Sequence, residues 1–323
     1  MPRWVRPLGQ AALTIGVLAA IVAAVDLSAV AEAVRRARWP WLCLAVALLP
    51  VNVGLDGWVW GRLLGAVDEQ LPPGQLARAL LCGFTLGFWT PVRVGEFAGR
   101  VWSVPGRNRW VLSLSVVAQR MLDMGVGVGV GLLLLGGTLY AGTLPLSTGW
   151  LLAAALGAGT VAVLAAAVLV PRRLSALGSA LFGETLSLPT QSSFFRRLTA
   201  GALLPALGGT VVRYFVFTGQ FAGLVWALSA EAPVAPVATA VGLTFYAKYL
   251  IPSLTLLDLG IREGGAVFFF SLLGLSPAVG LAASLLLFTL NTLLPAVVGL
   301  PTIRGLTVLG STAEDTAPAG ADS

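Results

Sequence analysis

Two short motifs place charged side chains within segments that are otherwise strongly apolar. The first is Thr90-Pro91-Val92-Arg93-Val94-Gly95-Glu96, followed by Arg100, and the second is Leu259-Gly260-Ile261-Arg262-Glu263. A charged residue at the centre of a bilayer costs about 2.5–3.5 kcal/mol on insertion scales, so such residues are rare there and usually functional. Each motif also carries Gly where a helix is expected to begin, and the free backbone N–H groups of a helix start favour anions. The motifs therefore predict a membrane protein that handles a polar group inside the bilayer.

Further charged and polar residues of the apolar segments are spaced to share helix faces. Arg93, Glu96 and Arg100 fall at positions i, i+3 and i+7 of a helix expected to begin near Pro91. The other members of the set are Arg120 with Asp123, Asn52 with Asp56, Arg213 with Gln220, and, around the second motif, Lys248, Asp258, Arg262 and Glu263. Six cations and five anions in this set could pair internally and serve only to hold broken helices together. The alternative is a polar pocket for a substrate, which we favour for the residues at the two helix breaks because broken helices are costly in lipid.

The composition is that of a polytopic membrane protein. Of the 323 residues, 57% are hydrophobic and 11% are charged, and the mean hydropathy is +0.89. A soluble domain carries about 25% charged residues. The net charge of +6 is scattered through loops, so we expect no nucleic-acid partner. The sequence has no His and only Cys43 and Cys82, which excludes His-dependent nucleophile pairs and argues against a metal site or any cofactor.

Hydropathy predicts an all-α bundle with about six spanning helices and two broken ones. The six spans are residues 8–25, 39–63, 113–140, 150–170, 203–228 and 277–300. The broken segments are 76–106, interrupted at Thr90-Pro91, and 237–274, interrupted at Pro252. The first span follows Arg3 and Arg6 like a signal peptide but is long for one, so we interpret it as an uncleaved helix. A single membrane domain covers residues 1–310, and 311–323 form an acidic tail expected to be disordered.

Arginine placement gives a topology for these segments. Residues 171–197 hold four arginines and are expected in the cytoplasm, whereas 141–149 and 229–235 hold no cation and are expected outside. The two broken segments then enter and leave from one face each, as re-entrant hairpins from opposite faces, with both termini of the chain in the cytoplasm. Such opposed hairpins suggest an inverted repeat of the transporter type. Arg35, Arg36 and Arg38 disagree with this scheme, because it places them outside.

Three motifs in order resemble the flippase-like transmembrane domain of the lysylphosphatidylglycerol synthases. That family carries Pro-x-Arg-x-Gly-Glu and a following Arg, matched here from Pro91 to Arg100. It then carries Arg-x-x-Asp, matched by Arg120 and Asp123, and a late Gly-Val-Arg-Glu, matched by residues 260–263. The family usually has Pro-Gly-Gly before the last motif, where this chain has Asp258, so substrate preference does not transfer. The 323 residues show no counterpart of the family's soluble aminoacyl-transferring domain, so we do not expect this chain to make lysylphosphatidylglycerol.

The resemblance implies movement of a lipid between leaflets, in a bacterial cytoplasmic membrane, with synthesis done elsewhere. The substrate would be a phospholipid or polyprenyl-type lipid with a polar, anionic headgroup. Guanidinium groups pair bidentately with phosphate, so Arg93, Arg262 and Arg120 or Lys248 are expected to contact it. Two alternatives remain open. One is a membrane-embedded enzyme that modifies a lipid headgroup through a carboxylate base, and the other is a non-catalytic subunit of a lipid-modifying enzyme.

Overall fold

The protein is described by a computed structural model that covers residues 34–90, 93–142, 197–251 and 260–303, with the single positions 28, 32 and 194. These residues are helical and include no β-strand, as predicted for an all-α bundle. The predicted spans 8–25 and 150–170, the arginine-rich loop up to Arg196, Asp258 and the tail 311–323 lie outside the described residues.

Four described helices are long and apolar enough to cross a bilayer. They are α3 (Trp39–Gly65), α6 (Arg109–Tyr140), α9 (Ala200–Leu228) and a helical run over Pro277–Val298. The run consists of α12 (Pro277–Phe288), the π-helix η3 (Thr289–Leu293) and α13 (Leu294–Val298), and the short α14 (Leu300–Ile303) follows it. About 20 residues suffice to span the hydrocarbon core. The four helices coincide with four of the six spans predicted from hydropathy.

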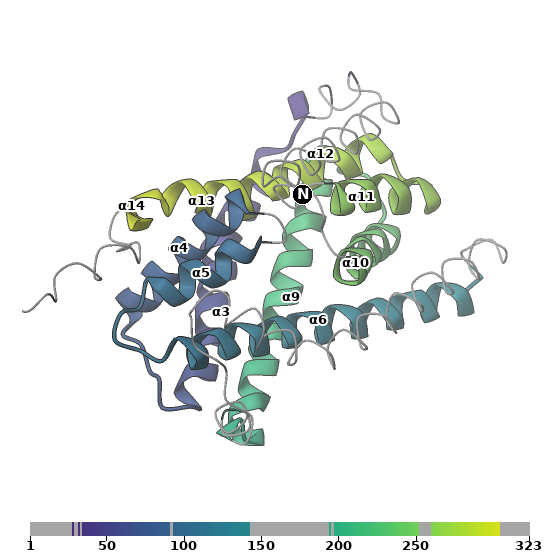
Figure 1. The fold of residues 1–323 in the computed structure, drawn as a ribbon. Helices are drawn as coiled ribbons and strands as arrows, with labels where there is room; N and C mark the ends of the chain where they lie inside the picture. The colour runs from purple at the N-terminus through teal and green to yellow at the C-terminus, as the bar shows by residue number, and fades with distance from the viewer. Residues whose placement is uncertain are drawn as a thin grey trace, which may run out of the picture.

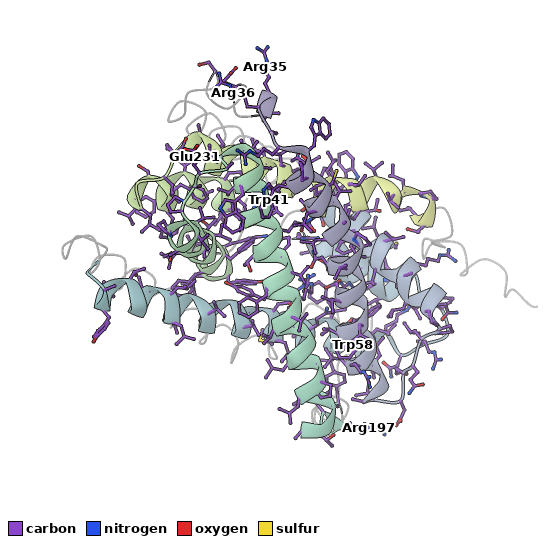
Figure 2. All side chains as sticks on the ribbon, turned by 180° about the vertical axis from the view of Figure 1, so that it is seen from behind. Arg35, Arg36, Trp41, Trp58, Arg197 and Glu231 are labelled. Atoms are coloured by element: carbon purple, nitrogen blue, oxygen red, sulfur yellow. The ribbon has the colours of Figure 1, made fainter. Side chains whose placement is uncertain are left out.

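Helices α3 and α9 run antiparallel through the middle of the molecule (Figure 1). At one end the backbone N–H of Arg38 donates to the Ala227 carbonyl at 2.7 Å, and at the other Arg197 pairs with Asp68 at 2.7 Å. Figure 2 shows Arg35, Arg36 and Glu231 at the first end and Arg197 at the opposite end. Arg35 and Arg36, two of the three arginines that disagreed with the predicted topology, therefore share an end of the molecule with Glu231 of the loop expected outside.

The first broken segment forms a tight helical hairpin of α4 (Pro73–Trp89) and α5 (Val94–Trp102). Its arms touch backbone to backbone through glycines. A Cβ atom built on Gly99 would lie 2.6 Å from the carbonyl oxygen of Cys82 and from the Cα of Gly83. The hydroxyl of Thr90 at the tip accepts a hydrogen bond from the N–H of Gly95 at 2.7 Å. A residue with a Cβ atom would clash at this contact, so glycine is required for the backbones of α4 and α5 to pack this closely.

The second broken segment, α10 (Val234–Leu250) and α11 (Ile261–Leu272), lies on the other side of α9 from the first (Figure 1). Its first arm packs on α6, where the rings of Tyr249 and Tyr246 fill the spaces that Gly127 and Gly131 leave. Helix α6 carries four glycines at alternate positions from 125 to 131. Two of them make these contacts, and the other two, Gly125 and Gly129, face open space.

Candidate functional site

A cavity of about 120 Å³ lies between the two hairpins and the long helices. Because a water site needs only about 10–15 Å³ by this kind of measure, the cavity has room for several water molecules. Both helix breaks contribute to its wall, Arg93 from the first and Arg262 from the second. Its polar and charged lining also includes Asn52, Asp56, Arg120, Asp123, Thr210, Arg213, Tyr214, Lys248, Tyr249, Asn291 and Thr292. Residues far apart in the sequence thus meet around one polar space.

Glu96 is the centre of an ion-pair network at the first hairpin. Its carboxylate accepts from Arg100 at 2.8 Å, accepts from Arg120 of α6 and lies 3.3 Å from Nε of Arg93. The side chain is almost wholly buried, and it occupies the third position of α5. A buried carboxylate requires this degree of pairing, because an unpaired charge at this depth would be very costly.

Asp56 extends the network to α3 and α9. One carboxylate oxygen accepts from Arg100 at 2.6 Å, and the other accepts from the Gln119 amide at 3.0 Å and lies 3.1 Å from Arg213. Arg100 is completely buried, also donates to Gln119 and is not part of the cavity wall. This arginine therefore positions the carboxylates from behind the cavity and does not line it.

Asp123 closes the network between α6 and α9. It accepts from Arg120 at 3.2 Å within its own helix and from Arg213 at 2.7 Å. The intrahelical pair that the i, i+3 spacing allowed is present, yet each partner also bridges to another helix. The pair therefore belongs to a network that joins α3, α5, α6 and α9.

The three carboxylates of this network are more deeply buried than three of its four arginines, Arg100 being the exception. The side chains of Asp56, Glu96 and Asp123 are at most 6% exposed, whereas those of Arg93, Arg120 and Arg213 are 25%, 33% and 20% exposed. Four arginines, with Arg100, face three carboxylates, which leaves one positive charge in excess. The carboxylates hold the guanidinium groups from the protein side, so the cavity presents mainly a cationic surface.

The second hairpin supplies a separate, neutral pair. Glu263 accepts from the backbone N–H of Gly260 at 2.8 Å and from Arg262 at 2.7 Å. Arg262 also donates to the Ser284 hydroxyl at 3.0 Å and lies over the Phe288 ring at 5.8 Å from its centroid. This arginine lines the cavity while Glu263 lies behind it, fully buried. The hydrogen bonds to Glu263 and Ser284 and the contact with the Phe288 ring fix the position of the Arg262 guanidinium in the cavity wall.

The second arms of both hairpins begin in the same way. Arg93 precedes α5 with φ +55°, and Gly260 precedes α11 with φ +112°. A glutamate stands at the third helical position of each, Glu96 and Glu263. In each case the chain turns through a positive φ, and a carboxylate near the helix start favours the positive end of the helix dipole. The local likeness of the two breaks is what the predicted inverted repeat requires.

A chain of side-chain amides joins α3, η3 and α9 beside the cavity. Asn52 of α3 donates to Oδ1 of Asn291 at 2.8 Å, Asn291 donates to Oε1 of Gln220 at 2.8 Å, and Gln220 donates to the Ala45 carbonyl at 2.6 Å. Asn291 belongs to the π-helix η3, a type of distortion that often marks functional sites. We call these three side chains the amide relay.

The residues predicted from the sequence divide into two groups in space. Arg93, Arg120, Asp123, Lys248 and Arg262 line the cavity, and the fully buried Glu96, Arg100 and Glu263 lie behind it. Asp258 is outside the described residues. The polar cavity residues that the sequence analysis did not identify are Thr210, Tyr214, Tyr249, Asn291 and Thr292, together with Gln119 in the network behind. Each of these is a polar residue within a long apolar segment, and that position was the signal by which the sequence could have identified it.

The fold and the site define an integral membrane protein of helices whose polar centre is a cavity lined by charged side chains. The chain belongs to the family described as the lysylphosphatidylglycerol synthase TM region, which it matches over residues 8–299. The resemblance drawn from the three motifs is thus confirmed. Comparison with curated proteins and with solved structures gives no match.

Proposed function

We propose that the protein binds the polar headgroup of a phospholipid in the central cavity and moves that lipid between the leaflets. The observation that carries the proposal is the cavity itself, in which Arg93 and Arg262 from the two helix breaks face one space. Guanidinium groups bind phosphate oxygens through paired hydrogen bonds. Membership of a family linked to lipid modification agrees with a lipid as the substrate.

The distribution of charge supports an anionic group in the headgroup. Arg93, Arg120 and Arg213 keep part of their surface open to the cavity, whereas their carboxylate partners are covered. A phosphate can therefore pair with the guanidinium groups while each remains anchored by its carboxylate. Acyl chains would stay in the surrounding lipid throughout.

The two hairpins suggest how a headgroup would reach the cavity from either leaflet. We propose that α4–α5 and α10–α11 are re-entrant and open toward opposite faces of a bacterial cytoplasmic membrane, with both chain termini in the cytoplasm. The described residues contain no nucleotide-binding motif that would drive the movement, so we propose that the movement is downhill, ion-coupled or driven by a partner enzyme that makes the lipid.

The test is transport in vesicles that contain the purified full chain and a labelled anionic phospholipid. We expect Arg93→Ala and Arg262→Ala each to lower the rate of movement between leaflets at least tenfold, because each removes a charge-assisted contact of roughly 1.5–3 kcal/mol. Arg107→Ala is the matched control, since the exposed Arg107 pairs with Glu69 outside the cavity. Wild-type rates in both cavity variants would refute the proposal, and a chemically altered lipid in mass spectra would favour an enzyme.

A further inference from the structure

The Ala45 carbonyl, at one end of the amide relay, fixes the direction of every hydrogen bond in the relay. The Ala45 carbonyl can only accept, so the Gln220 group that meets it at 2.6 Å must be the NH₂. The oxygen of Gln220 then accepts from Asn291, and the oxygen of Asn291 accepts from Asn52. Reversing any one amide would bring two oxygens or two NH₂ groups together. The relay therefore ends with the oxygen of Asn52 unused.

This oxygen belongs to a buried side chain on the cavity wall. Asn52 lines the cavity and is only 8% exposed, and its Oδ1 has no hydrogen-bond partner among the described residues. The acceptors nearby on the same helix are already in use, because both oxygens of Asp56 receive donors from Arg100, Gln119 and Arg213. A buried acceptor without a fixed partner in the protein is available to pair with a donor supplied by a ligand.

We infer that Asn52 selects lipids whose headgroup carries a hydrogen-bond donor beyond the phosphate, such as an N–H or a hydroxyl. The inference rests on the proposed function and narrows its substrate class. The guanidinium groups bind the phosphate, and the fixed acceptor of Asn52 accepts from the donor of the headgroup. Methylated or capped headgroups leave Asn52 unpaired and bind more weakly, even when their net charge is the same.

Two pairs of lipids with identical acyl chains separate donor recognition from size. Phosphatidylethanolamine and phosphatidylcholine have the same charge, but only the first has N–H groups and it is the smaller. Phosphatidylglycerol and phosphatidylmethanol are both anionic, but only the first has hydroxyl groups and it is the larger. We expect the donor-bearing lipid of each pair to bind the full chain roughly tenfold more tightly in a native mass-spectrometry titration, the factor for one buried hydrogen bond.

Two variants assign the preference to Asn52. Asn52→Leu is expected to bring both affinity ratios close to one. Thr244→Val is the control, because Thr244 is also buried but does not line the cavity, and its hydroxyl donates to the Ala240 carbonyl at 2.7 Å. We expect Thr244→Val to keep both ratios. The comparison of the two lipid pairs on the wild-type chain stands even if Asn52→Leu does not fold.

The outcomes distinguish the inference from the proposed function. Lipid binding that follows headgroup size, shows equal affinities within both pairs, or keeps its preference in Asn52→Leu overturns the inference alone. No retained lipid of any kind overturns both. Glycerophosphoglycerol, the headgroup without acyl chains, serves as a soluble competitor. It should compete at least roughly tenfold more weakly than phosphatidylglycerol, because acyl burial adds affinity, and equal competition would assign the cavity to a free phosphodiester.

Discussion

Arg93 combines a strained backbone with a side chain that reaches the cavity. Its φ of +55° and ψ of +29° lie in the left-handed region, which costs a residue with a Cβ roughly 1–2 kcal/mol. Glycine would fill this turn without strain, as Gly260 does at the second break. Strain of this kind persists where the surrounding structure imposes it, and it gathers at functional sites. The guanidinium of Arg93 is the evident reason for arginine at this position.

Two substitutions at position 93 separate the effect of backbone strain from the effect of losing the side chain. Arg93→Ala and Arg93→Gly both remove the guanidinium and its ion pair with Glu96, but only glycine relieves the backbone. We expect Arg93→Gly to be more stable than Arg93→Ala by about 1 kcal/mol, measured as the difference in unfolding free energy in detergent. Both variants should lose lipid movement to the same extent. Equal stability of the two would show that the left-handed turn is not strained.

Sequence patterns predicted the helices better than the interfaces between them. Hydropathy gave the extents of α3, α6 and α9, and the breaks were evident because residues preceding Pro91 and Pro252 are biased away from helix. The glycine pairs 83 and 87 on α4 and 95 and 99 on α5 both have the small-xxx-small spacing of close helix contacts. They were a usable signal for the tight hairpin, although spacing alone does not say which helix a glycine faces.

The π-helix and the network depend on tertiary contacts that spacing does not reveal. Pro295 has no N–H to donate to the carbonyl of Asn291 four residues earlier, so a local distortion could be anticipated there. Its form, which aims Asn291 at both Asn52 and Gln220, depends on helices distant in sequence. Arg213 and Asp56 likewise share faces with other polar residues, but only the packing of α9 on α3 brings them within 3.1 Å.

The hairpin contact predicts opposite effects for two glycine-to-alanine substitutions. In Gly99→Ala the new methyl group would lie 2.6 Å from backbone atoms of α4, which cannot move aside as a side chain would. We expect a loss of about 1–3 kcal/mol from this overpacking. Gly129→Ala in α6 meets open space and should stabilise the protein by about 0.5–1 kcal/mol through helix propensity. Thermal unfolding of the two variants in one detergent compares them directly, and a neutral Gly99→Ala would contradict the close hairpin contact.

At the scale of the whole molecule, the cavity exists only because two hairpins on opposite sides of α9 converge (Figure 1). Both hairpins contribute to its wall, and the ion pairs of the described residues tie the first hairpin to α3, α6 and α9. The volume of about 120 Å³ is well below the roughly 300–1,000 Å³ of typical small-molecule pockets. Under the proposed function, a lipid headgroup would require the hairpins to move apart, and its passage would depend on both hairpins at once.

This dependence predicts strong coupling between Arg93 and Arg262 although they belong to separate ion-pair groups. If both arginines contact one phosphate, the removal of either one already prevents the headgroup from binding in its productive position. Removing the second arginine then causes little further loss of rate. We expect the transport rate of Arg93→Ala/Arg262→Ala to lie within about threefold of the slower single variant, a coupling well above the few tenths of a kcal/mol seen for independent sites. Combining Arg93→Ala with Arg107→Ala provides the reference, because Arg107 lies outside the cavity and should contribute nothing. Multiplicative losses in the first double variant would place the two arginines at separate steps along the path, with no phosphate shared between them.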